Sequence, residues 1–430
     1  MTSGSGSGSG LGRRRFLKGM GLTAVLFALG DREVNLMEPS TKSKVFKVSN
    51  CPVPTGEDLH EGLEALLDLM SWQGVDLYRT QEKAWGAGPE GLIEKDDVVL
   101  IKVNGQWKYR GCTNSDVIRG LVRRILDHPN GFEGEVVIFD NGQGQGSMEA
   151  RAKGFGHYDN DDVHANAEDE SHSYMHLAEE VFKDSGKVSC YLLDGLKEIF
   201  IADDEHVTDG YRKTATGSYP CFTTKKGTRI ELREGVWTGN GYSPKLKLIN
   251  VPVLKHHGGC GVTAAVKHYY GVLSMGYRPL DYHYGELGLA VGEMMTNVRG
   301  PVLNILDAIW ISPVNHYGLP QDVQRLNILG ASLDPVALDY WGCKHVLYPA
   351  ATNPEHNPDL FQPLGHYLEQ ARDTINKNGG LFGRRVNLGD ENTELVSYAS
   401  VIDQVLQAAT RNEVNGDIAD RMKERADAGM

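Results

Sequence analysis

The segment from Lys255 to Lys267 holds the densest group of side chains that could do chemistry. It contains two lysines, two adjacent histidines, three closely spaced glycines and a threonine: Lys255, His256, His257, Gly258, Gly259, Gly261, Thr263 and Lys267. Glycines let a backbone turn tightly and present its N–H groups to an anion at the start of a helix. Thr263 would bind the ligand or cap that helix. The segment therefore predicts a phosphate or carboxylate cradle, with an ordinary glycine-rich turn as the alternative.

The same segment supplies the candidate catalytic groups. We assign catalysis to Lys255, His256, His257 and Lys267, with one histidine acting as general base or metal ligand. Adjacent histidines in extended structure point to opposite sides, so both would bind one metal only if the chain bent. Anion binding is assigned to Lys102, Asn104, Gly258, Gly259, Gly261 and Thr263, and a divalent metal to Asp140, Asp307, Asp339 and His257.

Most of these groups follow the ends of four predicted strands. The strands end at Lys102 with Asn104, at Asp140, at Lys255 to His257, and at Asp307. In open α/β sheets, ligands bind in the crevice beyond the carboxyl ends of the strands. We therefore expect the four endings to share one site at an edge of the sheet.

A strand–helix–strand unit begins the predicted domain. Residues 98–103 are short, β-branched and almost continuously apolar, as in a buried parallel strand, and residues 135–139 predict a second buried strand. Between them, residues 113–116 offer N-cap chemistry to an amphipathic helix that extends to about Ile125. Such a unit predicts a right-handed crossover and an α/β fold, with a mostly parallel sheet and helices on both faces.

Later segments repeat this alternation. Strands are expected at 246–255, where Pro252 ends or bulges the pairing, and at 302–307 and 325–330; helices are expected at 263–273, 335–347, 365–378, 393–410 and 414–425. The stretches 147–187 and 195–245 break the rhythm, and the second suggests hairpins. The predicted organisation is a signal peptide at 1–30, an α/β domain at 31–350 with these two insertions, and a helical C-terminal extension at 351–430.

The first thirty residues have the pattern of an export signal. A basic patch, residues 13–18, precedes an uncharged run to Gly30 that is too short to span a bilayer. The patch resembles a twin-arginine signal, which implies the Tat translocase as a partner and folded export to a periplasmic or other extracytoplasmic compartment. The start of an amphipathic helix is the alternative. After signal cleavage we expect no stable membrane span; retention of the signal as an anchor is left open.

Composition restricts the partners. The 430 residues carry a formal net charge of −13, and loss of residues 1–30 would remove four basic and no acidic residues, leaving −17. An acidic chain without a segregated basic face is repelled by phosphate backbones, so we expect no nucleic acid partner. A small anionic ligand would have to be held by local lysines against this global charge.

The six cysteines also restrict the cofactor. They are widely scattered and include no Cys-x-x-Cys pair, so we expect no iron–sulfur cluster. Export to an oxidising compartment would permit one or two long-range disulfides, which the spacing does not assign.

Several segments resemble the family catalogued as domain of unknown function 362. They are residues 101–104, Asp140, 248–257, 261–271, 304–308 and 330–339, within a resemblance that spans roughly residues 98–345. Val103 stands where this family usually has Pro, and His268 where Asn is common. The resemblance implies a domain sometimes fused to ferredoxin modules, without a settled activity, and this chain lacks the ferredoxin cysteines.

The leading functional hypothesis is an exported α/β enzyme that binds a small anionic substrate or cofactor. Metal-assisted redox or isomerisation chemistry on a carboxylate fits the candidate residues. One alternative is a non-catalytic carrier or assembly factor for a metal or cofactor. A second alternative is an accessory protein of iron–sulfur redox chemistry.

Overall fold

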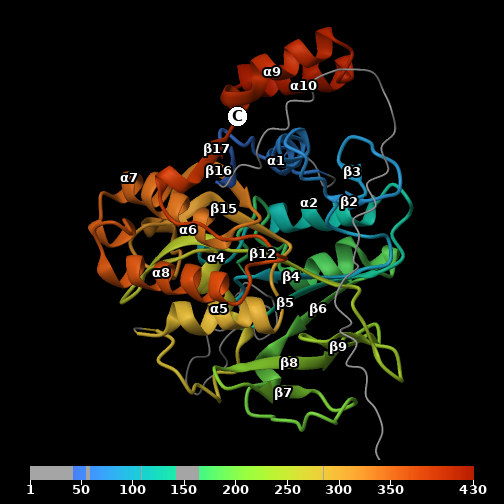
Figure 1. The fold of residues 1–430 in the computed structure, drawn as a ribbon, viewed down its shortest axis with the longest axis vertical. Coiled ribbons are helices and arrows are strands. Elements are labelled where there is room, and N and C mark those ends of the chain that lie inside the picture. Colours follow the sequence, from blue (N-terminus) through green and yellow to red (C-terminus); the bar gives the residue numbers. More distant parts are fainter. Residues whose placement is uncertain (1–41, 55–58, 108, 142–163, 284) are drawn as a thin grey trace, which may run out of the picture. The chain divides into compact units, whose positions relative to one another are not determined.

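A ten-stranded sheet runs through the part of the chain that the structure describes (Figure 1). The structure is a computed structural model, and it describes residues 42–54, 59–107, 109–141, 164–283 and 285–430. The strand order is β17-β1-β16-β15-β12-β4-β5-β6, with β13 paired to β15 and to β14. Their bounds are β1 (Ser43–Val48), β4 (Val98–Val103), β5 (Glu135–Asp140), β6 (Val188–Leu192), β12 (Leu246–Val251), β13 (Val253–His257), β14 (Gly261–Thr263), β15 (Leu303–Ser312), β16 (Gln324–Ser332) and β17 (Thr393–Val396).

Most pairs in this sheet are parallel. The pairs of β4 with β5 and β12, of β5 with β6, and of β15 with β12 and β13 are parallel, as is the pair of β1 with β17. Strand β16 is antiparallel to both β15 and β1, and β13 is antiparallel to β14. The predicted fold class, a mostly parallel sheet in an α/β fold, is confirmed.

Both faces of the sheet are buried, and β4 shows how the sequence achieves this. Val98 and Leu100 belong to one hydrophobic core, whereas Val99 and Ile101 belong to a second. Successive side chains of a strand point to opposite faces, so an almost continuous apolar run, here interrupted by Lys102 alone, is expected where helices cover both faces. This is why the apolar run at 98–103 predicts its strand without error at either end.

Helices cover the two faces as expected (Figure 1). One core includes residues of α1 (Glu61–Trp72), α2 (Ser115–Leu126), α9 (Tyr398–Thr410) and α10 (Gly416–Asp427). The other includes residues of α4 (Ala265–His268), α5 (Leu287–Asn297), α6 (Pro335–Trp341) and α8 (Gln362–Lys377). Asn114 is the N-cap of α2, as predicted for residues 113–116, and accepts hydrogen bonds from backbone amides of that helix. Asp334 caps α6 in the same way.

The hairpins expected within residues 195–245 form a second sheet. It is antiparallel and runs in the order β11-β10-β9-β8-β7. The bounds are β7 (Gly210–Lys213), β8 (Ser218–Thr223), β9 (Arg229–Glu231), β10 (Gly235–Trp237) and β11 (Tyr242–Ser243), and the short β2 (Tyr78–Arg79) pairs with β3 (Ala87–Gly88) elsewhere. Of the other insertion, 147–187, residues 147–163 lie outside the described residues, and the rest includes α3 (Tyr174–His176).

Two local predictions are corrected by the structure. Residues 393–396 are not helical but form edge strand β17, because Thr393, Leu395 and Val396 pair with β1. The helix expected over 263–273 is reduced to α4 followed by a 3₁₀ turn, Tyr269–Val272. The helix expected over 335–347 is confirmed, although its second half, Gly342–Leu347, is a π-helical stretch that follows α6. The single strand expected at 246–255 is divided by Pro252, as its proline indicated.

Three further observations bear on the sequence predictions. All six cysteines lie in the described residues, and each is buried and unpaired, so the disulfides left open above are not formed. Within the described residues, no helix has both the length and the apolar character needed to cross a membrane. Residues 41–430 form one unit, without a boundary near residue 350.

Candidate functional site

A cavity of about 220 Å³ lies beyond the carboxyl ends of β4 and β5. It is lined by three lysines, one aspartate, three amide side chains and several aromatic side chains. The lining residues are Lys102, Asn104, Gln106, Trp107, Asp140, Asn141, Lys255, His257, Thr263, Lys267, His268, Tyr270, Gly271, His316 and Tyr317. We call this the lysine cavity. Three lysines and one aspartate make it a locally basic site in an acidic chain.

A row of buried polar side chains crosses the sheet behind the lysine cavity. Lys102 of β4, Asn250 of β12, Asn304 of β15 and Ser332 of β16 are direct register partners on adjacent strands. All four are buried, at 1% exposure or less. Asn250 donates to Asn304 Oδ1 over 3.0 Å, and Asn304 donates to the Ser332 carbonyl over 3.2 Å. Buried polar groups need such partners. His268, which contacts both Asn250 and Lys102, links this row to the Lys102 ammonium group.

Lys102 uses all its donors within the protein. Its Nζ contacts Asp140 Oδ1 at 2.6 Å, the Val103 carbonyl at 2.9 Å and His268 Nε2 at 3.0 Å. An ammonium group has three N–H bonds, and three acceptors account for them. Asp140 Oδ2 in turn accepts from the Gly105 amide at 2.6 Å. Lys102 therefore supplies charge to the cavity and leaves no donor for a ligand.

The neutral tautomer of His268 follows from these contacts. Lys102 only donates, so His268 Nε2 accepts, and Nδ1 carries the proton that it donates to Asn250 Oδ1 over 2.7 Å. Burial and the Lys102 charge lower the pKa of His268 well below its usual value, which agrees with a neutral ring.

Lys255 and Lys267 have donors to spare. Lys255, which is 3% exposed, donates to the Gly111 carbonyl over 2.5 Å. Lys267, 5% exposed, lies over the ring of Tyr270 at 5.2 Å, and within the described residues no acceptor or carboxylate contacts its Nζ. Burial lowers the pKa of both groups, that of Lys255 to about 7, where neighbouring Lys267 and Lys102 also contribute.

Three histidine rings stack beside these lysines. His257 lies between His316, with ring centroids 5.2 Å apart, and His283, 5.7 Å away. Burial and the charge of Lys267 lower the pKa values of all three, those of His283 and His316 to about 4. His257 Nδ1 lies 2.8 Å from the Gly258 carbonyl, so this nitrogen carries the proton and Nε2 has the free lone pair.

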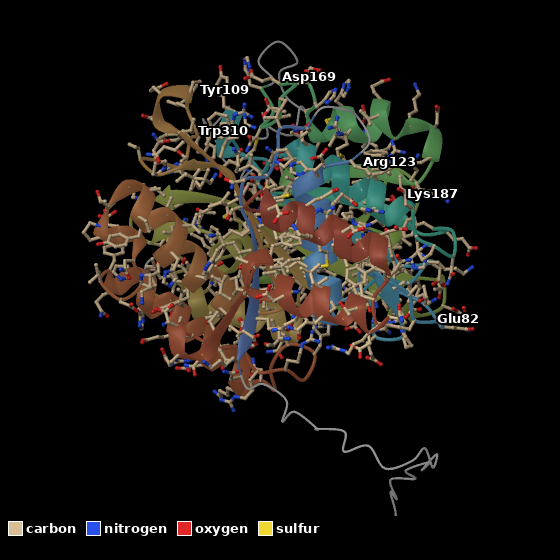
Figure 2. All side chains as sticks on the ribbon, turned by 90° about the horizontal axis from the view of Figure 1, so that it is seen from above. Glu82, Tyr109, Arg123, Asp169, Lys187 and Trp310 are labelled. Carbon is tan, nitrogen blue, oxygen red and sulfur yellow. The ribbon has the colours of Figure 1, made fainter. Side chains whose placement is uncertain are left out.

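Aromatic side chains form one wall of the lysine cavity. Trp107 contacts Tyr317 edge-on with centroids 4.7 Å apart, and His316 packs against both. The two loops that carry them touch backbone to backbone: Arg110 N donates to the Gly318 carbonyl, and a Cβ on Gly318 would lie 1.8 Å from Gly111 N. Tyr109 and Trp310 lie on the same side of the molecule (Figure 2), where the Arg110 guanidinium covers the Trp310 ring at 4.6 Å.

The glycine segment does not form the anion cradle that its sequence suggested. Gly258 and Gly259 are exposed and make the turn between β13 and β14, in which Gly259 has a φ of +84°. Helix α4 is only four residues long, and its first two amides donate to the carboxylate of Asp339, at 2.5 Å from Ala265 and 2.8 Å from Val266. The protein thus supplies its own anion where an external one was expected.

The other glycines and Thr263 have separate roles. A Cβ on Gly261 would lie 2.4 Å from the Glu355 carbonyl, so close packing with that loop requires glycine there. Thr263 does not cap α4, whose N-cap is Ala264; it lines the lysine cavity beside its β13 partner Lys255. Asn104 also lines the cavity, and its Oδ1 accepts from Val253 N over 3.0 Å.

Of the four residues assigned to a metal, Asp140 and His257 line the lysine cavity, but Asp307 and Asp339 do not. Asp307 binds the amides of Asn114 and Ile309 at 2.7 and 3.0 Å, and Asp339 caps α4, so neither lines the lysine cavity. Burial raises the pKa of Asp307 to about 7 and that of Asp339 to about 8. In the residues that the structure describes, no three His, Cys, Asp or Glu side chains are grouped as a metal ion would need.

The two adjacent histidines separate, as expected for extended structure. His257 lines the lysine cavity, whereas His256 points away and contacts His356, with Nδ1 and Nε2 3.0 Å apart. His256 is thus removed from the groups assigned to catalysis with it. Lys102, Asn104, Asp140, Lys255, His257, Thr263 and Lys267 are the predicted residues that the structure does bring together.

Sequence reasoning missed the aromatic wall and the role of His268. Trp107, His316 and Tyr317 lie in loops that no pattern connects. His268 carried a signal, because it departs from the residue common in the resembling family, but its partners Asn250 and Lys102 are set by strand register. A single sequence does not show which residues of two adjacent strands are register partners.

Comparisons with known proteins point to one family. No curated protein and no solved structure matches the chain. The region from β12 to the π-helical stretch after α6 contains Asn250, Lys255, Lys267 and His268, whereas Lys102 and Asp140 precede it. This region, residues 245–344, matches the family described as Domain of unknown function (DUF362), which confirms the predicted resemblance over those residues.

Proposed function

We propose that this protein is an enzyme that binds a small anionic substrate, a carboxylate or phosphate, in the lysine cavity. The observation that carries the proposal is the Lys267 amino group, which is buried at the cavity without an acceptor among the described residues. Burying an unpaired charge is costly, and a bound anion would remove that cost.

Counting donors supports the same conclusion. Lys255 spends one N–H bond on Gly111 and keeps at least one more, and Lys267 spends none on the described residues. These two side chains therefore hold enough free donors for a carboxylate or phosphate group, while the Lys102 charge adds attraction without a direct hydrogen bond.

Groups that can move protons lie beside the proposed anion. His257 Nε2 has a free lone pair, and the pKa of Lys255, lowered by burial to about 7, lies within the range useful for acid–base chemistry at neutral pH. This combination favours an enzyme over a passive carrier, and turnover of a bound carboxylate would distinguish the two.

Calorimetry with inorganic phosphate and with pyruvate tests the anion site. Replacing Lys267 by Met should weaken binding of the better ligand by about ten-fold or more, because a charged hydrogen bond is lost. The exposed Lys423, which pairs with Asp427 on α10, provides the matched Lys423→Met control with the same change of net charge. Equal affinities for the two variants would contradict the proposal.

Export by the Tat translocase is the second part of the proposed function. Its support is the sequence of residues 13–30 described above. Replacing Arg13 and Arg14 by Lys keeps the charge and should abolish export of the folded protein, whereas Lys18→Arg should not. Unchanged secretion of the double variant, measured by cell fractionation, would count against this route.

A further inference from the structure

We propose that Lys255 forms an imine with the keto group of a 2-oxo carboxylate whose carboxylate is held by Lys267. The inference rests on the proposed anion site and deepens it by naming the substrate class and the atom that reacts.

Lys255 is placed as a nucleophile. It lies in β13 beside the bulge where that strand shifts register against β15, and its side chain reaches the lysine cavity. One N–H is fixed by the Gly111 carbonyl at 2.5 Å, which orients the amine but occupies no lone pair. The Gly111 carbonyl is itself held, because the 109–111 turn packs against Gly318.

The surroundings of Lys255 favour the neutral amine that such a reaction needs. Its side chain is buried, and it shares one cavity with the ammonium groups of Lys102 and Lys267. The carboxylate that lines this cavity, Asp140, is bound to Lys102 and to the Gly105 amide, so it does not pair with Lys255. Desolvation and neighbouring cations are the conditions under which lysines act as imine-forming nucleophiles.

The other two lysines are less suited to attack a carbonyl group. Lys102 has three acceptors around its nitrogen and thus no free lone pair. Lys267 lies over the Tyr270 ring, a contact that favours its charged form, and a charged Lys267 is what a carboxylate would bind. The two roles, anchor and nucleophile, therefore fall on different lysines of one cavity.

The proposed step is balanced within the substrate and Lys255. The Nζ lone pair attacks the keto carbon, a C–N bond forms, and the carbonyl oxygen takes up one amine proton to give a carbinolamine. Loss of the C–O bond releases water, which carries away the second amine proton, and leaves the C=N bond of the imine. No oxidant or reductant is required.

Reduction with sodium borohydride in the presence of pyruvate tests the step. Hydride adds to the imine carbon and makes the adduct permanent, so intact mass and peptide mapping should find one reduced pyruvyl group, on Lys255. Lactate, which has the same charge but no keto group, should give none. Lys255→Arg should lose the adduct, and the surface control Lys423→Arg should retain it.

The outcomes separate this inference from the proposed function. An adduct on another lysine, or pyruvate binding that depends on Lys267 without any adduct, would overturn the imine and leave the anion site standing. Binding of inorganic phosphate without binding of pyruvate would also overturn the imine alone. Absence of an adduct and of binding of both pyruvate and phosphate would overturn both. Mapping the adduct in the unaltered protein does not depend on how the variants fold.

Discussion

Lys102 donates to the Nε2 of His268 over 3.0 Å, a contact that joins the lysine cavity to the polar row across the sheet. The contact has one direction only, because a lysine cannot accept. It therefore sets the tautomer of His268, in which Nε2 accepts from Lys102 and Nδ1 donates to Asn250 Oδ1. A residue at the cavity and a residue in the middle of β12 are thus held by one imidazole.

Replacement of His268 tests whether this imidazole positions Lys102. His268→Leu leaves a buried Lys102 donor and the Asn250 acceptor unpaired, which should reduce the free energy of unfolding by about 2–4 kcal/mol. His268→Gln retains one acceptor and one donor and should lose less. Urea unfolding of the three proteins measures this difference. Equal losses for Leu and Gln would show that ring packing, and not the hydrogen bonds, is what matters.

Gly271 packs directly against the ion pair of Lys102 and Asp140. A Cβ there would lie 2.8 Å from Lys102 Nζ and 3.0 Å from Asp140 Oδ1. The ammonium has no room to move because three acceptors surround it. Gly271→Ala should therefore lower the free energy of unfolding by about 1–3 kcal/mol and weaken anion binding.

The matched control for Gly271→Ala is Gly258→Ala. Gly258 lies on the exposed turn after β13, and a Cβ there would meet no atom within 4 Å. This substitution should change neither stability nor pyruvate affinity. Thermal melting and calorimetry on both variants check the pair, and a stable, fully binding Gly271→Ala protein would show that the ion pair tolerates displacement.

The sequence could predict the strands that carry the site because their chemistry is local. An apolar run covered on both faces defines β4, and Pro252 divides β12 from β13, since a proline cannot donate to a ladder. The convergence of Lys102, Asp140 and Lys255 at one cavity then follows from a general rule for parallel sheets.

The errors arose where tertiary contacts compete with a local pattern. The glycine segment has the residues of an anion cradle, but Asp339, 74 positions from Ala265, already occupies the helix amides. Likewise, Thr393 to Val396 continue an apolar helical pattern, yet they pair with β1 at the far end of the chain. Contacts across such separations leave no periodicity that a single sequence could reveal.

We expect His60, which lies outside the lysine cavity, to make the stability of the protein sensitive to acid. It is 1% exposed, and its Nδ1 accepts from Leu63 N at the start of α1. Burial lowers the pKa of His60 from 6.5 to about 4, so the unfolded chain binds more protons between these values. The stability contributed by neutral His60 is complete above pH 6.5 and is lost as the pH falls towards 4.

An asparagine can replace His60 as an N-cap without titrating. His60→Asn should therefore retain about 2–3 kcal/mol that the parent loses between pH 7 and pH 4. Urea unfolding at a series of pH values measures this, with His366→Asn, at an exposed position of α8, as the control. The same loss in parent and His60→Asn would place the acid sensitivity on other buried groups.

Replacing Lys267 by Met should raise the stability of the protein and weaken anion binding. Its buried ammonium lacks an acceptor among the described residues, so the empty protein bears a cost that Lys267→Met removes. We expect this variant to gain about 1–2 kcal/mol in unfolding free energy while it loses anion affinity. Thermal melting with and without pyruvate measures both quantities. Lys423→Met, at the surface, should stay within about 0.5 kcal/mol of the parent. A Lys267→Met protein that is less stable than the parent would mean that the ammonium already has a partner, and the case for an external anion would fall with it.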